Sequence, residues 1–365
     1  MKIKDMPGWQ KKKFLFCFFF YVIIAVVFLS ITLTMLATDK IGEDDYWDSA
    51  VNPTGEVIEA AQAMSTKHGA VDVTVGTYVE NLRDISLGDN NFSLEALVWF
   101  KWNGDPALNM AENFVVYKGK INERTTLKNY SKGGENYQLV RLDVTITKNY
   151  WNRRFPLESH QLKMYIESDY EAEKVRFIDD KENSGINHSL GISGFTLRRS
   201  GTAAMAYKYD NNRGDPEVKG EDLMYFEHCT ALEINRDGMG LYIKCFVALF
   251  GTTVWVLIAL YICTNHHVDP LSMMPGALFG TISNIMIGAN LLPDALQAGL
   301  LEFVNIWGVF TIIAVTIVII NINRVRNKHK EKEFAKTLGR VMFYTILIGT
   351  LLAHILLPLF AFSFK

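Results

Sequence analysis

The stretch that decides the fold is an uncharged apolar run near the amino terminus, Phe14–Ala37, with the sequence FLFCFFFYVIIAVVFLSITLTMLA. As a helix, a run of this length is long enough to cross the roughly 30 Å hydrocarbon core of a bilayer. A secretory signal has a shorter apolar stretch and small residues just before its cleavage site. For a cut after Ala37, the third residue before the cut would be Met35, which is too large for that position. We predict an uncleaved anchor helix, with a cleaved signal peptide as the alternative.

The charges around this run predict its orientation. Lys11, Lys12 and Lys13 precede it directly, and basic residues beside a membrane segment stay in the cytoplasm. Residues 38–240, which carry most of the charge, would then be exported whether or not the run is cleaved. The sequence therefore predicts a multi-pass protein of the plasma (inner) membrane with an extracellular or periplasmic domain.

Further apolar segments follow the exported part. Three are clear, at residues 241–263, 300–322 and 341–362, whereas 271–292 is weaker because it contains several polar residues. This weaker segment is either a short amphipathic or re-entrant piece or a fourth span that faces water or protein. The basic stretch 323–340 should be cytoplasmic, and an exported domain reaches it only after an odd number of crossings. We therefore predict that 271–292 spans, which gives a four-helix transmembrane bundle over residues 241–365.

The composition excludes several classes of function. The 365 residues include 37 basic and 39 acidic side chains, so there is no basic excess for nucleic-acid binding. The four cysteines form no CxxC pair, and the adjacent His266 and His267 do not by themselves make a metal site. Nucleophile-elbow, phosphate-loop and zinc-protease motifs are missing from the sequence. We expect no enzyme activity, no cofactor, no metal and no nucleic-acid partner.

The exported domain has the periodicity of strands. Apolar and polar residues alternate in Val71–Val75, Leu142–Thr147 and Leu162–Glu167, and Phe92–Trp102 is rich in aromatic and branched side chains. Short strands at this spacing predict an antiparallel β-sandwich over residues 70–240. Residues 38–69 are predicted to be a linker that contains a short helix.

The order of sandwich, short junction and four helices resembles the pentameric ligand-gated ion channels, specifically the prokaryotic type without the loop disulfide. The resemblance covers roughly residues 70–362 and is carried by five motifs in the expected order. These are VTVGTYVENL (73–82), NGDP (103–106), RFPLESH (154–160), EINR (233–236) and NLLP (290–293). It implies an immunoglobulin-like sandwich that senses, a homopentamer in contact with membrane lipids, an unidentified small-molecule ligand and a permeant monovalent cation.

The family's register implies which residues line a pore. On the helix 271–292 they are Ser272, Gly276, Phe279, Ser283, Met286 and Asn290, with Asp269 at the inner mouth, where a ring of carboxylates would favour cations. The alternative is a helix that packs closely through Gly276, Gly280 and Gly288, with Asp269 as a helix cap. Pro275 and the glycines also support another function, a non-conducting membrane sensor or scaffold with the same architecture.

The resemblance also implies residues that couple the two parts. Arg236, before the membrane domain, would pair with Glu158 in the signature loop or with Asp84 or Asp89 in a turn of the sandwich; the alternative is an arginine that reaches lipid phosphates. Pro156 and Pro293 belong to the same junction.

In the family the ligand lies between subunits within aromatic walls, which suit a cationic amine. The matching aromatic side chains here are Trp102, Trp151, Tyr207, Tyr209 and Tyr225. The alternative for each is a place in the sandwich core.

Overall fold

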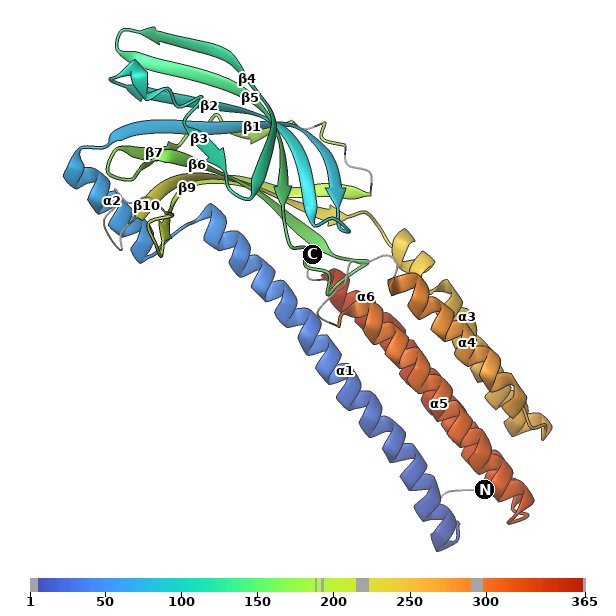
Figure 1. The fold of residues 1–365 in the computed structure, drawn as a ribbon. Coiled ribbons are helices and arrows are strands. Elements are labelled where there is room, and N and C mark those ends of the chain that lie inside the picture. The colour runs from blue at the N-terminus through green and yellow to red at the C-terminus, as the bar shows by residue number, and fades with distance from the viewer. Residues whose placement is uncertain (1–5, 188, 192–193, 215–222, 290–297, 364–365) are drawn as a thin grey trace. The chain divides into compact units, whose positions relative to one another are not determined.

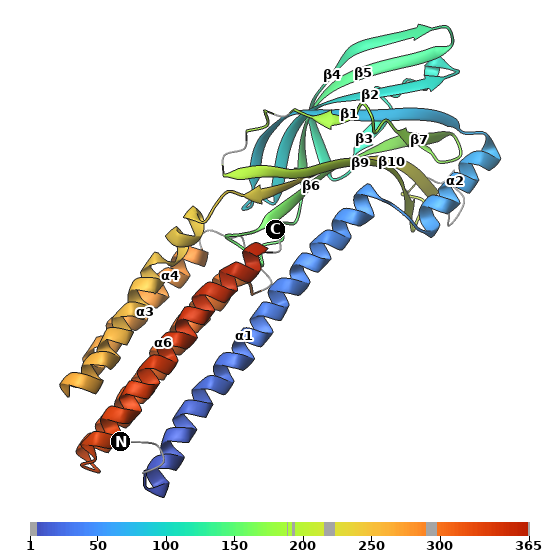
Figure 2. The ribbon, with the colours of Figure 1, turned by 180° about the vertical axis from the view of Figure 1, so that it is seen from behind.

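The computed structural model describes residues 6–187, 189–191, 194–214, 223–289 and 298–363. The chain forms two compact units. The strand-rich unit contains Ile41–Trp151 and Ser159–Asp237, and the helical unit contains Met1–Lys40, Asn152–Glu158 and Gly238–Lys365. Figures 1 and 2 show the elements of both units from opposite sides.

The first sheet of the strand-rich unit has the strand order β4-β5-β2-β1-β7, with β8 also paired to β1. Its strands are β1 (Val71–Ser86), β2 (Asn91–Asn103), β4 (Gly119–Lys132), β5 (Glu135–Thr147), β7 (Val175–Asp179) and β8 (Gly185–Ile186). The β1–β2, β2–β5 and β4–β5 pairs are antiparallel, but β7 and β8 run parallel to β1. The expectation of a wholly antiparallel arrangement is therefore wrong at this edge, because the chain passes through the second sheet before it returns as β7.

The second sheet has the strand order β3-β6-β10-β9 and is antiparallel throughout. Its strands are β3 (Phe114–Val116), β6 (Ser159–Glu171), β9 (Phe195–Tyr209) and β10 (Leu223–Arg236). The strands predicted from alternating residues are confirmed in both sheets. In β6, for example, Leu162, Met164 and Ile166 are fully buried on one face, as their spacing predicts.

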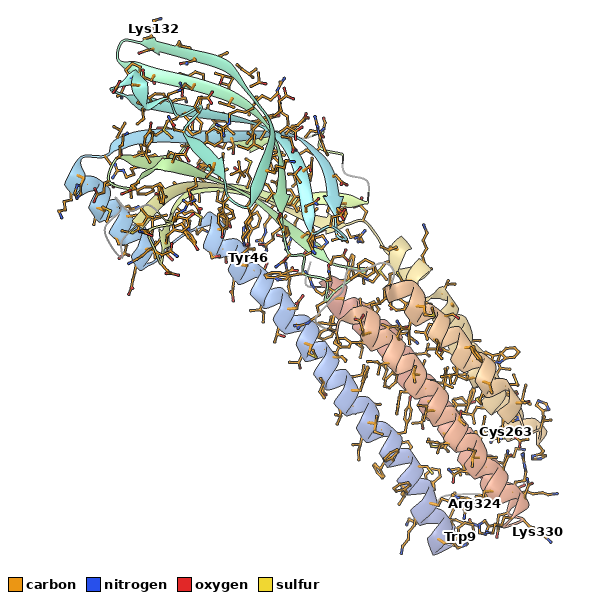
Figure 3. The ribbon with its side chains drawn as sticks, viewed as in Figure 1. Trp9, Tyr46, Lys132, Cys263, Arg324 and Lys330 are labelled. Carbon is orange, nitrogen blue, oxygen red and sulfur yellow. The ribbon has the colours of Figure 1, made fainter. Side chains whose placement is uncertain are left out.

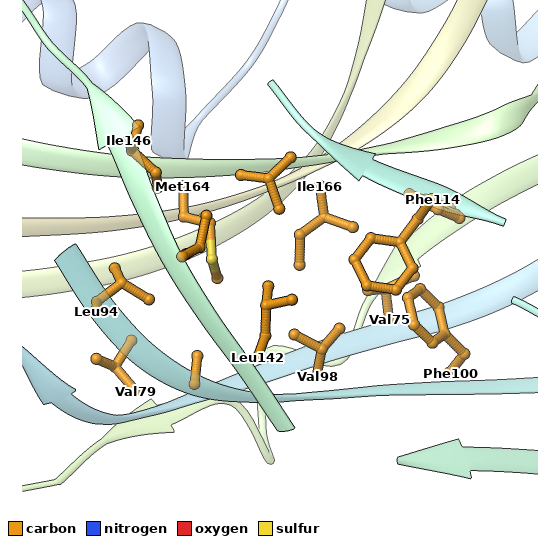
Figure 4. Close-up of a cluster of buried hydrophobic side chains, with 14 of the residues drawn as sticks. Val75, Val79, Leu94, Val98, Phe100, Phe114, Leu142, Ile146, Met164 and Ile166 are labelled. Carbon is orange, nitrogen blue, oxygen red and sulfur yellow. The ribbon is translucent and has the colours of Figure 1, made fainter. Parts of the chain in front are cut away.

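Side chains from both sheets form one buried hydrophobic cluster, part of which is shown in Figure 4. Val98 and Leu142 come from the first sheet, and Met164 and Ile166 come from the second. Phe100 and Phe114 belong to different sheets, and their ring centroids are 5.4 Å apart. Burial of these apolar surfaces is the main force that holds the strand-rich unit together.

The other face of the second sheet is covered in part by the end of helix α1 (Gly8–Val51). Trp47 and Ala50 of α1 are buried against Cys229 and Ala231 of β10. Figure 3 shows Tyr46 at this end of the helix, beside the strands. Helix α2 (Glu56–His68) follows and buries Ala61 in the main core. The predicted short helix is thus confirmed, but the preceding residues are helical where a linker was expected.

The helical unit consists of the first part of α1 and the helices that follow the strands. These are α3 (Gly240–His266), α4 (Met274–Ala289), α5 (Leu300–Asn327) and α6 (Lys332–Ser363). In the part of the chain that the structure describes, four helices are long and apolar enough to cross a membrane: the amino-terminal helix, α3, α5 and α6. The 16 residues of α4 span about 24 Å at 1.5 Å per residue, so the spanning role of 271–292 stays a prediction.

Two basic segments lie at the same end of the helical unit. Trp9 of α1 contacts His329 and Phe334, with ring centroids 5.2 Å and 5.6 Å apart. Figure 3 shows Trp9, Arg324 and Lys330 together at this end. The stretch 323–340 is mostly helical, because α5 and α6 extend into it and leave a four-residue connection. The lysines before Phe14 and the basic α5–α6 connection therefore fall on the same side, as positive-inside orientation requires.

Candidate functional site

The predicted pore face of α4 is exposed in the single chain. Ser272, Gly276 and Ser283 are exposed, and Phe279 and Met286 are 72% and 63% exposed. Gly276, Phe279, Ser283 and Met286 follow each other at intervals of three and four, so they share one side of α4, whereas Ser272 lies just before the helix begins. Leu278, Ile282 and Ile285 are exposed beside them. Asn290 lies outside the described residues.

The opposite face of α4 packs within the helical unit. Met274, Ala277, Thr281 and Asn284 are buried there. The Asn284 side-chain amide donates a hydrogen bond to Oδ1 of Asn305 on α5 at 2.8 Å. The two polar residues of this face, Thr281 and Asn284, are thus part of the packing of α4 within the unit.

Pro275 and the glycines of α4 support the non-conducting alternative, and the structure shows the surroundings of Pro275, Gly276 and Gly280. Pro275 is in the first turn of α4, where the backbone N–H that proline lacks has no helical acceptor. A Cβ added to Gly280 would lie 2.7 Å from Oγ1 of Thr252 on α3, whereas one added to Gly276 would meet nothing within 4 Å. Close helix packing therefore requires a small residue at Gly280 but not at Gly276.

Asp269 lies between α3 and α4 and is exposed. Its Oδ1 accepts a hydrogen bond from the backbone N–H of Leu271 at 3.2 Å, at the start of the short 3-10 helix η3 (Leu271–Met273). Pro270 is the N-cap residue of η3, so Asp269 bonds the backbone from one position before the cap, and its carboxylate is exposed. His267 near it is 3.5 Å from Arg326 of α5, so Asp269 lies at the end of the unit that carries the basic segments. Within the described residues there is no cluster of side chains suited to a metal ion.

The predicted junction residues divide between the two units. Arg236 ends β10 in the strand-rich unit, where its guanidinium lies 4.5 Å from the Phe195 ring centroid. Asp89 is in the same unit, in the turn after β1, and accepts a hydrogen bond from Ser86 Oγ at 2.7 Å. Glu158 and Pro156 belong to the helical unit, and Glu158 is fully buried. The coupling of Arg236 to Glu158 stays a prediction, and Pro293 lies outside the described residues.

The segment Asn152–Glu158, which contains the first part of the signature motif 154–160, is anchored within the helical unit. Its Phe155 and Leu157 are buried with Leu36, Tyr242 and other residues of α1, α3, α5 and α6. The Arg153 carbonyl accepts a hydrogen bond from the backbone N–H of Leu300 at 2.7 Å. Arg153 and Arg154 also pair with Asp39 of α1, at 3.6 Å and 3.5 Å. The loop is thus fastened to the amino-terminal helix as well as to α5.

Within the single chain, the aromatic residues predicted for ligand binding lie in three places. Trp102 is 3% exposed in the main core and donates its indole N–H to the Asp105 carbonyl at 3.0 Å. It is therefore a core residue, the alternative that its sequence also allowed. Trp151 contacts Tyr46 of α1, with ring centroids 5.4 Å apart. The three tyrosines, in contrast, lie together on β9 and β10.

Tyr207 and Tyr209 have ring centroids 4.8 Å apart, and Tyr209 and Tyr225 are 5.7 Å apart. Tyr117 extends this row at 6.0 Å from Tyr207. Arg213 stacks on Tyr209 at 4.4 Å. The tyrosines thus form an aromatic row on which the guanidinium of Arg213 is already stacked.

Two buried carboxylates lie next to the tyrosine row. Glu167 of β6 and Glu227 of β10 are directly opposite each other in the strand pairing. Glu167 accepts hydrogen bonds from Tyr209 at 2.6 Å and from Arg213 at 3.1 Å. Burial, with a further contribution from Glu167, raises the pKa of Glu227 to about 8. The pair can therefore take up or release a proton near neutral pH.

Sequence reasoning did not assign a role to Tyr117, Glu167, Arg213 or Glu227. A signal was present for β6, because Lys163, Tyr165 and Glu167 alternate with core residues and so share the other face of the strand. No comparable signal in the sequence indicated that Glu227 of β10 and Tyr209 of β9 lie beside Glu167. No protein-family model matches the sequence, and no curated protein matches it significantly.

Proposed function

We propose that the chain is a subunit of a homopentameric, cation-preferring channel whose strand-rich unit, an exported immunoglobulin-like sandwich, responds to a ligand or to protons. In this proposal α4 lines the pore and the apolar helices hold it in the plasma membrane. The observation that carries the proposal is the exposed face of α4, on which Gly276 and Ser283 accompany Phe279 and Met286, with Ser272 exposed just before the helix begins.

A comparison with α3 supports an interior position for this face. The exposed side of α3 carries large apolar side chains, among them Ile243, Val247, Val254, Trp255, Ile258 and Tyr261. Such a surface suits lipid, since hydrocarbon offers no hydrogen bonds. The exposed Ser283 and Gly276 of α4, and Ser272 just before it, suit water or another subunit better. A single such helix cannot enclose a water path, so the face requires several copies around an axis.

The ring of Phe279 side chains would be the gate, because apolar constrictions close a pore by excluding water. Asp269 lies about ten residues earlier, on the side of the basic segments, and a ring of its carboxylates would attract cations at the inner mouth. We expect Asp269→Lys to lower the cation current or reverse the selectivity, measured as the reversal potential in asymmetric NaCl.

Water access to α4 tests the proposal directly. The native residues Cys17, Cys229, Cys245 and Cys263 are first replaced by alanine, and single cysteines are then introduced at Phe279 or Ser283 on the exposed face. Thr281, buried on the opposite face, and Ile258, on the lipid-suited side of α3, are the matched control positions. A charged thiosulfonate reagent should modify the first two and change the current in planar bilayers recorded across pH and candidate amines.

Modification at positions 279 and 283 that is no faster than at 281 and 258, in any condition, would contradict a pore. The helix would then serve packing, and the non-conducting sensor or scaffold would be the better function.

A further inference from the structure

A cavity of about 520 Å³ lies within the strand-rich unit, apart from the residues proposed for the pore. Its walls come from the end of α1, from β2, β5 and β6, from the segment that follows β5 and from the turn between β3 and β4. The lining residues are Tyr46, Phe92, Tyr117, Lys118, Ile146, Thr147, Lys148, Asn149, Trp151, Gln161, Lys163 and Tyr165. The volume is in the range of small-molecule sites, and an apolar wall with a few convergent polar groups is typical of them.

The charged side chains that line this cavity are all basic. Lys118, Lys148 and Lys163 line it, and there is no carboxylate among the described residues of its wall. Glu43 of α1 lies outside the wall, but its charge acts on Lys148. Glu43 is buried and accepts a hydrogen bond from Ser159 Oγ at 2.8 Å. Three cations therefore line the cavity, and the carboxylate that acts on one of them is already engaged by a hydroxyl.

Two of the lysines are in surroundings that disfavour their charge. Lys163 is 5% exposed, so its ammonium group is largely removed from water. Two contacts oppose this cost, because its Nζ lies 3.1 Å from the centroid of the Tyr46 ring and donates to the Tyr46 carbonyl. Burial lowers the pKa of Lys163 to about 7, and burial lowers the pKa of Lys148 to about 8 although Glu43 opposes this. A bound anion would stabilise both ammonium groups, because an opposite charge at close range favours the charged form.

The polar and apolar groups of the cavity are arranged to suit a particular kind of anion. Gln161 and Asn149 supply amide groups beside the lysines, whereas Trp151, Phe92 and Ile146 supply an apolar wall. We propose that this cavity is a binding site for a small monocarboxylate with a flat apolar body, held by Lys148 and Lys163 and covered by the end of α1. The site is independent of conduction, so a chain that conducts nothing would still bind the ligand.

The charges that face Lys163 and Lys148 give the site a pH dependence. Tyr46 faces Lys163 from α1, Tyr165 from β6 and Cys229 from β10, and Lys148 and Lys118 share the wall. Glu43 acts on Lys148. A monocarboxylate such as benzoate stays ionised above pH 6, whereas the lysines lose their protons as the pH rises through 7 and 8. Affinity should fall by at least about tenfold between pH 6.5 and pH 9.

The test uses the full chain in an uncharged detergent and benzoate as the probe, with isothermal titration calorimetry as the measurement. Saturable binding is expected for the wild type, and Lys148→Gln and Lys163→Met should each weaken it by tenfold or more. Lys120→Gln, at an exposed lysine of β4 outside the cavity, should leave the affinity within twofold. Benzylamine, which has a similar shape and the opposite charge, should not bind.

The proposal is overturned if benzoate does not saturate, if benzylamine binds equally well, or if both cavity variants bind like the wild type. If Lys163→Met does not fold, the test is whether benzoate protects Lys163 of the wild-type protein from acetylation. Benzoate should slow acetylation of Lys163, followed by mass spectrometry, and leave that of Lys120 unchanged. Equal acetylation of Lys163 with and without benzoate would also overturn the proposal.

Discussion

Phe279 and Asn284 show how two residues on opposite faces of α4 are used differently. Asn284 is buried and bonded to Asn305, so a polar group within an apolar unit has found the partner that it needs. Phe279 is the most exposed large apolar residue among those of α4 whose side chains the structure describes. An aromatic side chain in such a position has contacts to gain only outside the single chain.

Phe279→Ser should raise the resting conductance of the reconstituted protein. Serine side chains are smaller than phenylalanine rings and hold water, so the closed pore would no longer exclude it. Single-channel and macroscopic currents in planar bilayers measure the effect, and Ile258→Ser on α3 is the control. A resting current equal to that of the wild type would show that position 279 does not close the pore.

Glu227→Gln should remove a pH dependence of stability. The pKa of Glu227 is raised from 4.5 to about 8, so between these values the folded state holds a proton that the unfolded chain releases. The contribution of Glu227 to stability is therefore greatest below pH 4.5, falls as the pH rises towards 8 and is then constant. A difference of one between the folded and unfolded pKa values corresponds to about 1.4 kcal/mol, so the loss over this range is on the order of a few kcal/mol.

Hydrogen exchange of β10 measured from pH 5 to pH 8 tests this prediction. Glutamine is neutral and similar in shape, so the variant should show a flatter pH profile than the wild type. Glu112→Gln, at an exposed position, should follow the wild-type profile. Parallel profiles for the wild type and Glu227→Gln would mean that Glu227 does not hold the proton.

The last turns of α1 cover part of one face of the second sheet and shield the residues beneath them. Trp47 is 4% exposed, and the Arg199 guanidinium lies 4.4 Å from its ring centroid. Cys229 beneath it is fully buried, and burial raises the pKa of its thiol to about 12. A thiol in these surroundings is shielded and largely protonated, so it should not react.

Trp47→Ala should expose Cys229 to thiol reagents. Loss of a buried tryptophan costs about 3–5 kcal/mol, which is enough to release the last turns of α1 from the sheet. The modification rate of Cys229, assigned by mass spectrometry, measures this release. Ser49→Ala, at an exposed position of the same helix, is the control. A slow rate in Trp47→Ala, equal to that of Ser49→Ala, would show that other residues shield the thiol.

At the scale of the whole molecule, the channel proposal requires an assembly of several chains. The exposed face of α4 encloses a water path only when several such faces surround an axis, and the resemblance to the pentameric channels implies five copies. Native mass spectrometry from mild detergent gives the count, and crosslinking in membranes before extraction controls for loss of subunits. A monomer or dimer in both measurements would contradict the channel.

A double-mutant cycle tests whether Arg236 and Glu158 couple the two units. Arg236→Gln and Glu158→Gln should each impair assembly or gating, and the double variant should lose less than the sum if the two residues interact. Particle mass and current amplitude are measured for all four proteins of the cycle. Strict additivity in both measurements would show that Arg236 and Glu158 do not interact.

Much of the architecture could be predicted from local patterns. The apolar runs indicated the long helices, and alternating residues such as Leu162, Met164 and Ile166 indicated the strands and their buried face. Phe279 and Ser283, which the family's register assigns to a pore face, are both exposed on α4, and their role in a pore stays a prediction. Such patterns are readable because the periods of helices and strands are properties of neighbouring residues.

Local patterns in the sequence were enough to predict the long apolar helices, the strand-rich region and the buried face of strands such as β6. Tertiary structure alone decided that Trp102 is a core residue, that β7 runs parallel to β1, and that α1 continues onto the second sheet. It also brought Lys148 and Lys163 to one cavity. The physical reason is that these arrangements depend on strand register and on contacts between residues far apart in the chain, for which no local period exists.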